Sequence, residues 1–204
     1  MTDAELLDAW REGDARAGNE LLERHVDALV RFFESKADDA VDDLVQRTML
    51  ACVLHRDRMR EASSFRGFLF AVARNEIYDH YKRAARERNA FDPAVSAVRD
   101  LAPTPSAAIA EGDQRGAITF ALRTIPIELQ IAIELHYWED LTTAELADAL
   151  GVPQGTAKSR LRRAKELLRE RLEGGPAPTR DGDRDLDAWA AEVGLRVRDG
   201  KDDG

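Results

Sequence analysis

Apolar side chains recur at intervals of three and four residues along most of this chain of 204 residues. No segment alternates between apolar and polar side chains, which is the pattern typical of a half-buried strand. The chain is also rich in Ala, Leu, Glu and Arg, which favour helices. We therefore predict an all-α protein, with helices over residues 3–13, 18–34, 38–58, 64–88, 113–123, 126–138, 142–150 and 154–173.

The region 91–112 interrupts this periodicity. It contains Pro93, Pro103 and Pro105 and few large apolar side chains, a composition typical of a linker. We therefore expect two small helical domains joined by a Pro-containing linker. The expected boundaries are 1–90 for the first domain, 91–112 for the linker, 113–173 for the second domain and 174–204 for an acidic tail with one short helix around 186–193.

Several features bear on the compartment. The N-terminus is acidic and no apolar segment follows it, as a signal peptide would require. The longest apolar run, 68–73, is far shorter than the roughly 20 residues that span a membrane. A single cysteine, Cys52, excludes an intrachain disulfide and is typical of a reducing compartment. We expect a soluble, cytoplasmic protein without a membrane segment.

The charge is unevenly distributed. The chain has 30 Lys and Arg against 39 Asp and Glu, a net charge of −9. Two short blocks are nevertheless basic: 63–90 has six basic and three acidic residues, and 151–173 has seven and three. Because phosphates attract clustered Lys and Arg, this distribution predicts two separate nucleic-acid contacts on an otherwise acidic protein.

The second basic block follows the signature of a helix-turn-helix. Thr142 and Glu145 have the spacing of a capping box, which fixes where the first helix begins. Gly151 can adopt the left-handed conformation that ends this helix, and Pro153 can begin the next one. The predicted structure is a short helix, a tight turn and a longer basic helix.

On that longer helix, residues 157, 161, 164 and 168 form an apolar stripe. A helical wheel places Lys158, Arg162, Lys165 and Arg169 about 100° round from it, with Ser159 and Arg163 on the far side. A cationic exposed face suits insertion into a DNA major groove. The alternative is a solvated helix face with internal ion pairs such as Arg162 with Glu166.

The helix expected over 64–88 opens at Ser63 or Ser64, and its apolar residues Phe65, Phe68, Leu69, Val72, Ala73 and Tyr81 are expected to face inward. Basic, amide and aromatic side chains then remain for the outside, a mixture that suits melted DNA because phosphates need charge and bases need stacking surfaces. They are Arg66, Arg74, Asn75, Tyr78, Lys82, Arg83 and Arg86. Tyr78 suits a core role and a stacking role equally well.

Three motifs occur in a fixed order: Asp43-Leu44-Val45-Gln46, the run from Phe65 to Asn75, and the helix-turn-helix. In this order they resemble a bacterial RNA polymerase sigma factor of the sigma-70 family, in its extracytoplasmic-function (ECF) group, over residues 3–173. The resemblance implies a sigma-2-like domain and a sigma-4-like domain, and a factor that binds core polymerase and directs initiation at −10 and −35 promoter elements.

The resemblance also implies roles for individual residues. The polymerase β′ coiled coil would bind Asp43, Leu44, Gln46 and Thr48, and the β flap and an anti-sigma factor are further candidate partners. The −10 element would be read and opened by Arg74, Asn75, Tyr78, Asp79, Lys82, Arg83 and Arg86, with Asn75 at the base pocket. The −35 element would be read by Lys158, Ser159, Arg160, Arg162 and Arg163.

The docking helix departs from the family pattern at two positions. Arg47 stands where the family usually carries an acid, and Met49 stands where it usually carries an aromatic residue. The tail from Gly174 extends beyond the family pattern, so the resemblance implies nothing about its role.

No catalytic or metal-binding constellation stands out. Glu134, His136 and Asp140 are close in sequence, but the spacing of two between Glu134 and His136 points them to different helix faces. No glycine-rich loop with the lysine needed to cradle phosphates is present. We expect no enzyme activity, cofactor or metal. The alternatives to a sigma factor are a sigma-like decoy that binds an anti-sigma factor and a helix-turn-helix repressor.

Overall fold

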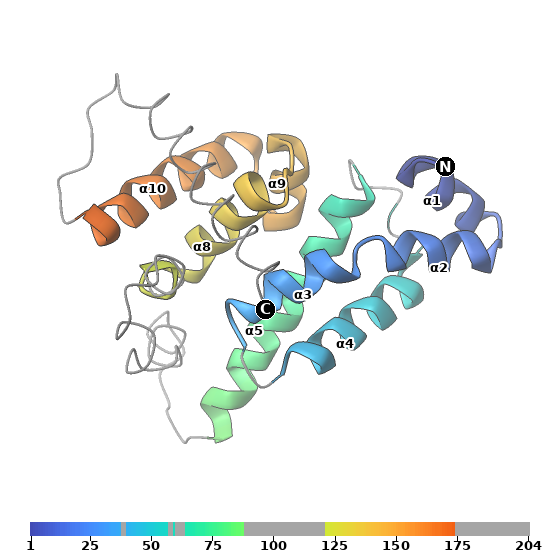
Figure 1. Cartoon of the computed structure of the whole chain (residues 1–204), viewed down its shortest axis with the longest axis horizontal. Coiled ribbons are helices and arrows are strands. Elements are labelled where there is room, and N and C mark those ends of the chain that lie inside the picture. Colours follow the sequence, from blue (N-terminus) through green and yellow to red (C-terminus); the bar gives the residue numbers. More distant parts are fainter. Residues whose placement is uncertain (38–39, 57–58, 60–63, 88–120, 174–204) are drawn as a thin grey trace, which may run out of the picture. The chain divides into compact units, whose positions relative to one another are not determined.

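A computed structural model of the chain describes residues 1–37, 40–56, 59, 64–87 and 121–173 (Figure 1). Within these residues the regular structure is helical and no strand occurs, which confirms the all-α prediction. The predicted linker, the tail and its short helix lie outside the described residues. The named elements are α1 (Asp3–Arg11), α2 (Ala15–Glu23), α3 (Val26–Glu34), α4 (Val41–Leu54), α5 (Phe65–Glu87), α8 (Ile127–Ile133), the π-helix η2 (Glu134–Trp138), α9 (Thr143–Leu150) and α10 (Gln154–Glu173).

Two compact units make up the structure. One comprises Met1–His80 and Leu141–Pro153, and the other comprises Tyr81–Asp140 and Gln154–Gly204. The division therefore falls within α5 and at the turn before α10, whereas the sequence places the boundary in the linker. Since the linker itself is not described, the domain boundaries 1–90 and 113–173 stay predictions.

The helix predicted over 18–34 is two helices. Helix α2 ends at Glu23 and α3 begins at Val26. At the break, His25 Nε2 lies 2.7 Å from Asp3 Oδ2, and its ring centroid lies 5.3 Å from that of Phe65. These contacts link residues distant in sequence, so local periodicity could not reveal the break.

The core of the first unit is built from α1 to α5. Phe32 packs edge-on against Phe33, with ring centroids 5.2 Å apart, and lies 5.6 Å from the ring of Phe70. On α5 the expected inward residues Phe65, Leu69 and Ala73 are buried, but Phe68, Val72 and Tyr81 are half-buried. Phe70 and Ile77 take their places in the core. The largest fully buried side chains of this unit are Leu6, Leu21, Leu29, Phe33, Leu44, Met59, Leu69, Phe70 and Ile77.

Gly18 is required where α2 meets α1. A Cβ at this position would overlap the indole ring of Trp10, which is itself buried. Replacing a helical glycine by alanine ordinarily stabilises a helix by about 0.5–1 kcal/mol. We expect Gly18→Ala to lower the free energy of unfolding instead, by about 1–3 kcal/mol, because the core is overpacked.

A urea titration of the full chain measures this effect. Gly155→Ala is the matched control, because no atom lies within 4 Å of a Cβ built there and α10 gains helix propensity. A Gly18→Ala protein as stable as the wild type would contradict the close packing of α1 on α2.

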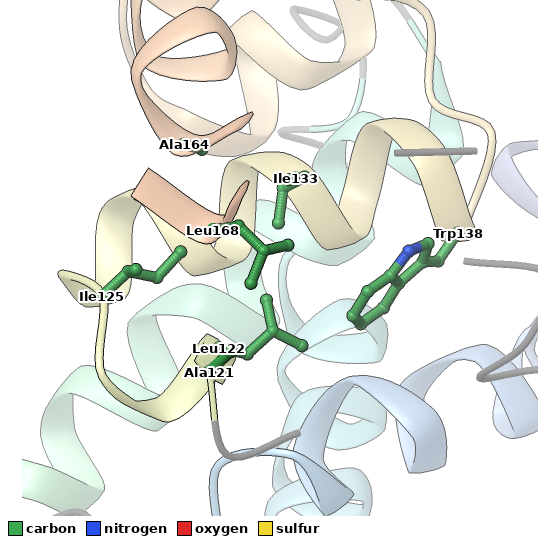
Figure 2. Close-up of a cluster of buried hydrophobic side chains, with 7 residues drawn as sticks. All are labelled: Ala121, Leu122, Ile125, Ile133, Trp138, Ala164 and Leu168. Atoms are coloured by element: carbon green, nitrogen blue, oxygen red, sulfur yellow. The ribbon is translucent and has the colours of Figure 1, made fainter. Parts of the chain in front are cut away.

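In the second unit, α8 and α10 pack together around a separate core (Figure 2). Its buried members come from the segment before α8, from α8 and η2, and from α10: Ala121, Leu122, Ile125, Ile133, Trp138, Ala164 and Leu168. Figure 2 shows Leu168 between Ile133 and Leu122 at the centre of this cluster. The core thereby orients α10, which leaves the opposite face of that helix exposed.

Candidate DNA-binding and polymerase-binding surfaces

The turn before α10 forms as the sequence predicts. Thr142 Oγ1 accepts a hydrogen bond from the Glu145 amide at 3.3 Å, and Glu145 Oε2 accepts one from the Thr142 amide at 2.8 Å. Burial alone would raise the pKa of Glu145, but hydrogen bonds from Ser64 and Thr142 lower it below its usual range. Gly151 ends α9 with φ of 62°, in the left-handed region, and α10 begins one residue after Pro153.

Helix α10 presents most of the predicted −35 residues to solvent. The predicted apolar stripe of Ala157, Leu161, Ala164 and Leu168 is buried, as expected. On the other side Lys158, Ser159, Arg162 and Arg163 are exposed, and Arg160 is half-buried. The Ser159 hydroxyl donates to the Gly155 carbonyl one turn earlier in the same helix at 2.9 Å.

Two basic residues of α10 do not lie on this exposed face, contrary to the helical-wheel prediction. Lys165 is only 6% exposed, with its Nζ 5.8 Å from the ring centroid of Tyr137. Arg169 is half-buried. A helical wheel predicts that both lie beside Lys158 and Arg162. In the structure α10 packs on α8, and the C-terminal half of the predicted basic face is covered.

Arg162 and Arg163 also form ion pairs within α10, as the alternative interpretation of a solvated helix face predicts. Arg163 Nη1 lies 3.3 Å from Glu166 Oε2, and Arg162 Nη1 lies 3.7 Å from Glu166 Oε1. The arginine side chains are 59% and 63% exposed, and ion pairs in such a setting contribute about 0–1 kcal/mol. Both guanidinium groups can therefore exchange Glu166 for a base or a phosphate at little cost.

Helix α5 carries a second exposed polar face. Asn75, Asp79, Lys82, Arg83 and Arg86 are all exposed, at spacings of four, three, one and three residues. Such spacing places them on one side of a helix, over a length of about 16 Å. Arg74 and Tyr78 are half-buried beside this face, and Arg74 Nη2 donates to Asn75 Oδ1 at 3.2 Å. The structure thus brings the predicted −10 residues together along one helix.

The burial of residues on α4 differs from what the predicted docking site requires. Asp43 and Gln46 are exposed, but Leu44 and Thr48 are both fully buried, at 0% exposure. The Thr48 hydroxyl donates to the Leu44 carbonyl at 2.7 Å, inside the unit. Leu44 and Thr48 therefore hold α4 in the core, and a direct contact with a partner is not open to them.

The outer face of α4 contains residues that the sequence interpretation missed. Leu50, Val53 and Leu54 are 59%, 44% and 69% exposed. They continue the exposed side that begins with Asp43 and Gln46, opposite the buried residues Leu44, Thr48 and Cys52. A helical wheel drawn from Leu44 places Leu50 and Val53 about 120° and 180° round from it, so the sequence already indicates that these two face outward. An exposed apolar cluster of this kind is typical of a protein-binding surface. We call Asp43, Gln46, Leu50, Val53 and Leu54 the α4 outer face.

Glu134 and His136, which are close in sequence to Asp140, make other contacts in the structure. Glu134 is buried, and its Oε1 accepts a hydrogen bond from Gln130 Nε2 at 3.0 Å. The His136 ring packs edge-on against Tyr137, with centroids 4.7 Å apart. In the part of the chain that the structure describes, no three His, Cys, Asp or Glu residues form a group that could hold a metal ion. None of the described helices is both long and apolar enough to cross a membrane.

Comparisons with known proteins show which family this chain resembles. The family model described as "Sigma-70 region 2" matches residues 20–87, which include α4 and α5, and "Sigma-70, region 4" matches residues 115–168, which include most of α10. The ECF RNA polymerase sigma factor SigL of Mycobacterium tuberculosis is 34% identical over 156 residues, covering 75% of this chain and 87% of SigL. The ECF sigma factor SigF of Caulobacter vibrioides is 33% identical over 165 residues, covering 80% and 86%.

A solved structure is also similar. The sigma factor RpoE of Bartonella quintana, crystallised in complex with the anti-sigma factor NepR, matches with a TM-score of 0.59 and 26% identity. The match covers 76% of this chain and 96% of the solved one. The protein is a member of a class of transcription initiation factors. It belongs to the sigma-70 family, in its ECF group.

Proposed function

We propose that this chain performs the function of its family through three separate surfaces. It binds core RNA polymerase and directs promoter-specific transcription initiation. The α4 outer face binds the β′ coiled coil, the exposed face of α5 reads and opens the −10 element, and the exposed residues of α10 read the −35 element. The observation that carries the proposal is that the two basic blocks form two exposed faces on separate helices, each within a matched sigma region.

The assignment to −35 recognition rests on α10. A helix enters a major groove when one side is packed and the other offers donors, and this helix has both. Lys158, Arg162 and Arg163 supply the positive charge, and arginine can donate to both O6 and N7 of guanine. Ser159 and Arg160 lie beside them, and Arg160 is half-buried, which suits a phosphate contact at the edge of the face.

The assignment to −10 recognition rests on α5. Its exposed face combines Asn75, an amide that can bond base edges, with the cations Lys82, Arg83 and Arg86, which can neutralise phosphates. Asp79 on the same face limits non-specific attraction to DNA, since such binding is mostly phosphate neutralisation. Tyr78, half-buried beside this face, is the aromatic side chain proposed for stacking.

The domain roles follow from these assignments. Residues 1–90 form the sigma-2-like domain and 113–173 the sigma-4-like domain, which also contacts the β flap. The matches of family models over 20–87 and 115–168 support this division. The factor works in the cytoplasm, where RNA polymerase is found, as a regulator without catalysis of its own. An anti-sigma factor, such as the one bound to RpoE in the solved structure, is a further partner.

Run-off transcription tests the proposal. Purified core polymerase is supplied with DNA from upstream of this chain's own gene, with and without the chain. We expect a discrete transcript only when the chain is present, and its start point would locate both elements. A sigma-like decoy would give neither a transcript nor core binding in a pull-down. The exposed cations of α10 favour the sigma factor, because a decoy has no need of them.

A further inference from the structure

Arg47 occupies a distinctive position in α4. It lies on α4, the helix proposed to bind polymerase, one residue after Gln46 of the α4 outer face. In the structure its guanidinium turns toward α5. Arg47 Nε donates to Glu76 Oε2 at 2.8 Å, and Arg47 Nη1 lies 3.8 Å from Asp43 Oδ2 one turn earlier on α4.

The ion pair with Glu76 is well placed to hold two helices together. It joins residues 29 positions apart in sequence, and Glu76 is only 17% exposed. A charge-assisted hydrogen bond in such a setting is stronger than a neutral one and is screened less by salt than an exposed pair. Because α4 and α5 are linked by this bond, a shift of one helix is transmitted to the other.

Glu76 adjoins the face of α5 assigned to the −10 element. Asn75, its neighbour, is exposed and is the residue proposed for the base pocket. Arg47 in turn lies next to Gln46 and one turn from Asp43 on the α4 outer face. The ion pair therefore joins the edge of one functional face to the edge of the other.

We propose that Arg47 is a positioning residue. Through Glu76 it fixes the −10 face of α5 relative to the α4 outer face, so that binding to polymerase places Asn75 correctly for strand opening. It does so without contacting polymerase or DNA. This inference rests on the proposed function, since it assigns α4 to polymerase and α5 to the −10 element.

A double-mutant cycle tests it with Arg47→Gln, Glu76→Gln and the double variant, each assembled with core polymerase. Glutamine keeps much of the side-chain length and introduces no new repulsion. The measurements are the affinity for core polymerase, the rate of −10 strand opening followed by permanganate reactivity of unpaired thymines, and the midpoint of thermal unfolding.

We expect each single variant to open the promoter about fivefold more slowly, and the double variant to be no slower than either single one, because the paired groups act as a unit. Core affinity should stay within about twofold, since other residues make the contact. Arg47→Lys should recover most of the rate, because it keeps the charge. Arg16→Gln, at an exposed position on α2, is the matched control and should change nothing.

The outcomes separate the two proposals. A wild-type holoenzyme that opens no promoter would overturn the proposed function. If the wild type opens promoters but Arg47→Gln lowers core affinity while Glu76→Gln has no effect, Arg47 is a direct polymerase contact and the inference is wrong. Rates that fall only in proportion to a lowered unfolding midpoint would assign the pair to stability alone, which also overturns it.

Discussion

The double variant Leu50→Asp, Val53→Asp will lose its binding to core RNA polymerase and keep its fold. Leu50 and Val53 are 59% and 44% exposed on the α4 outer face, so the free protein loses little packing when they change. In the complex each carboxylate would be buried against the partner without a hydrogen-bond partner. Because an uncompensated buried charge costs about 3–5 kcal/mol, we expect the double variant to bind at least about 100-fold more weakly.

Leu44→Asp is the matched comparison on the same helix. Leu44 is fully buried, so a charge there should lower the free energy of unfolding by several kcal/mol, on the order of 3–5, and unfold the first unit. Binding measured by titration of labelled core polymerase, together with a thermal melt, separates the two effects. A Leu50→Asp, Val53→Asp protein that binds core normally would show that the α4 outer face is not the docking surface.

Arg163→Ala will weaken discrimination at the −35 element. Its side chain is 59% exposed and its guanidinium pairs with Glu166, an exposed contact that a guanine in the major groove can replace. Loss of a bidentate contact should reduce the preference for the correct −35 base by about 1–3 kcal/mol, or roughly 5- to 150-fold. The measurement is holoenzyme binding to a promoter and to the same promoter with single substitutions in the −35 element.

Arg171→Ala is the control, because Arg171 is exposed on α10 but lies about 12 Å further along the helix axis. It should leave base preference unchanged. If Arg163→Ala instead weakens binding equally on every sequence, Arg163 contacts a phosphate and not a base. An unchanged affinity and preference would contradict its place in the DNA interface.

Much of this architecture could be predicted from local patterns. The capping box at Thr142 and Glu145, the left-handed Gly151 and the buried stripe of α10 each depend on residues within a turn or two of one another. Such features depend on the residue types at neighbouring positions, which can be read directly from the sequence. The same is true of the exposed face of α5, whose members recur at helical spacing.

The predictions that failed depend on contacts between distant segments. The break between α2 and α3 follows from contacts of His25 with Asp3 and Phe65, and the burial of Lys165 follows from packing near Tyr137. Leu44 and Thr48 were assigned to docking from the family motif alone, which does not distinguish residues that support a surface from those that form it. Burial makes that distinction: Leu44 and Thr48 are buried, and the exposure of Leu50, Val53 and Leu54 supports the proposal that these three residues form the docking surface.

Helices α5 and α10 are proposed to read two separate promoter elements. Single added cysteines test it, because the natural Cys52 is fully buried and its burial raises the thiol pKa to about 12, which keeps it unreactive. Ser159→Cys and Asp79→Cys are each labelled with an iron chelate that cuts nearby DNA, then bound to core polymerase on the promoter. We predict cutting near −35 from position 159 and near −10 from position 79. Cutting by both labels at the same element, or cutting that does not require core polymerase, would show that the two helices do not read separate elements as parts of the holoenzyme.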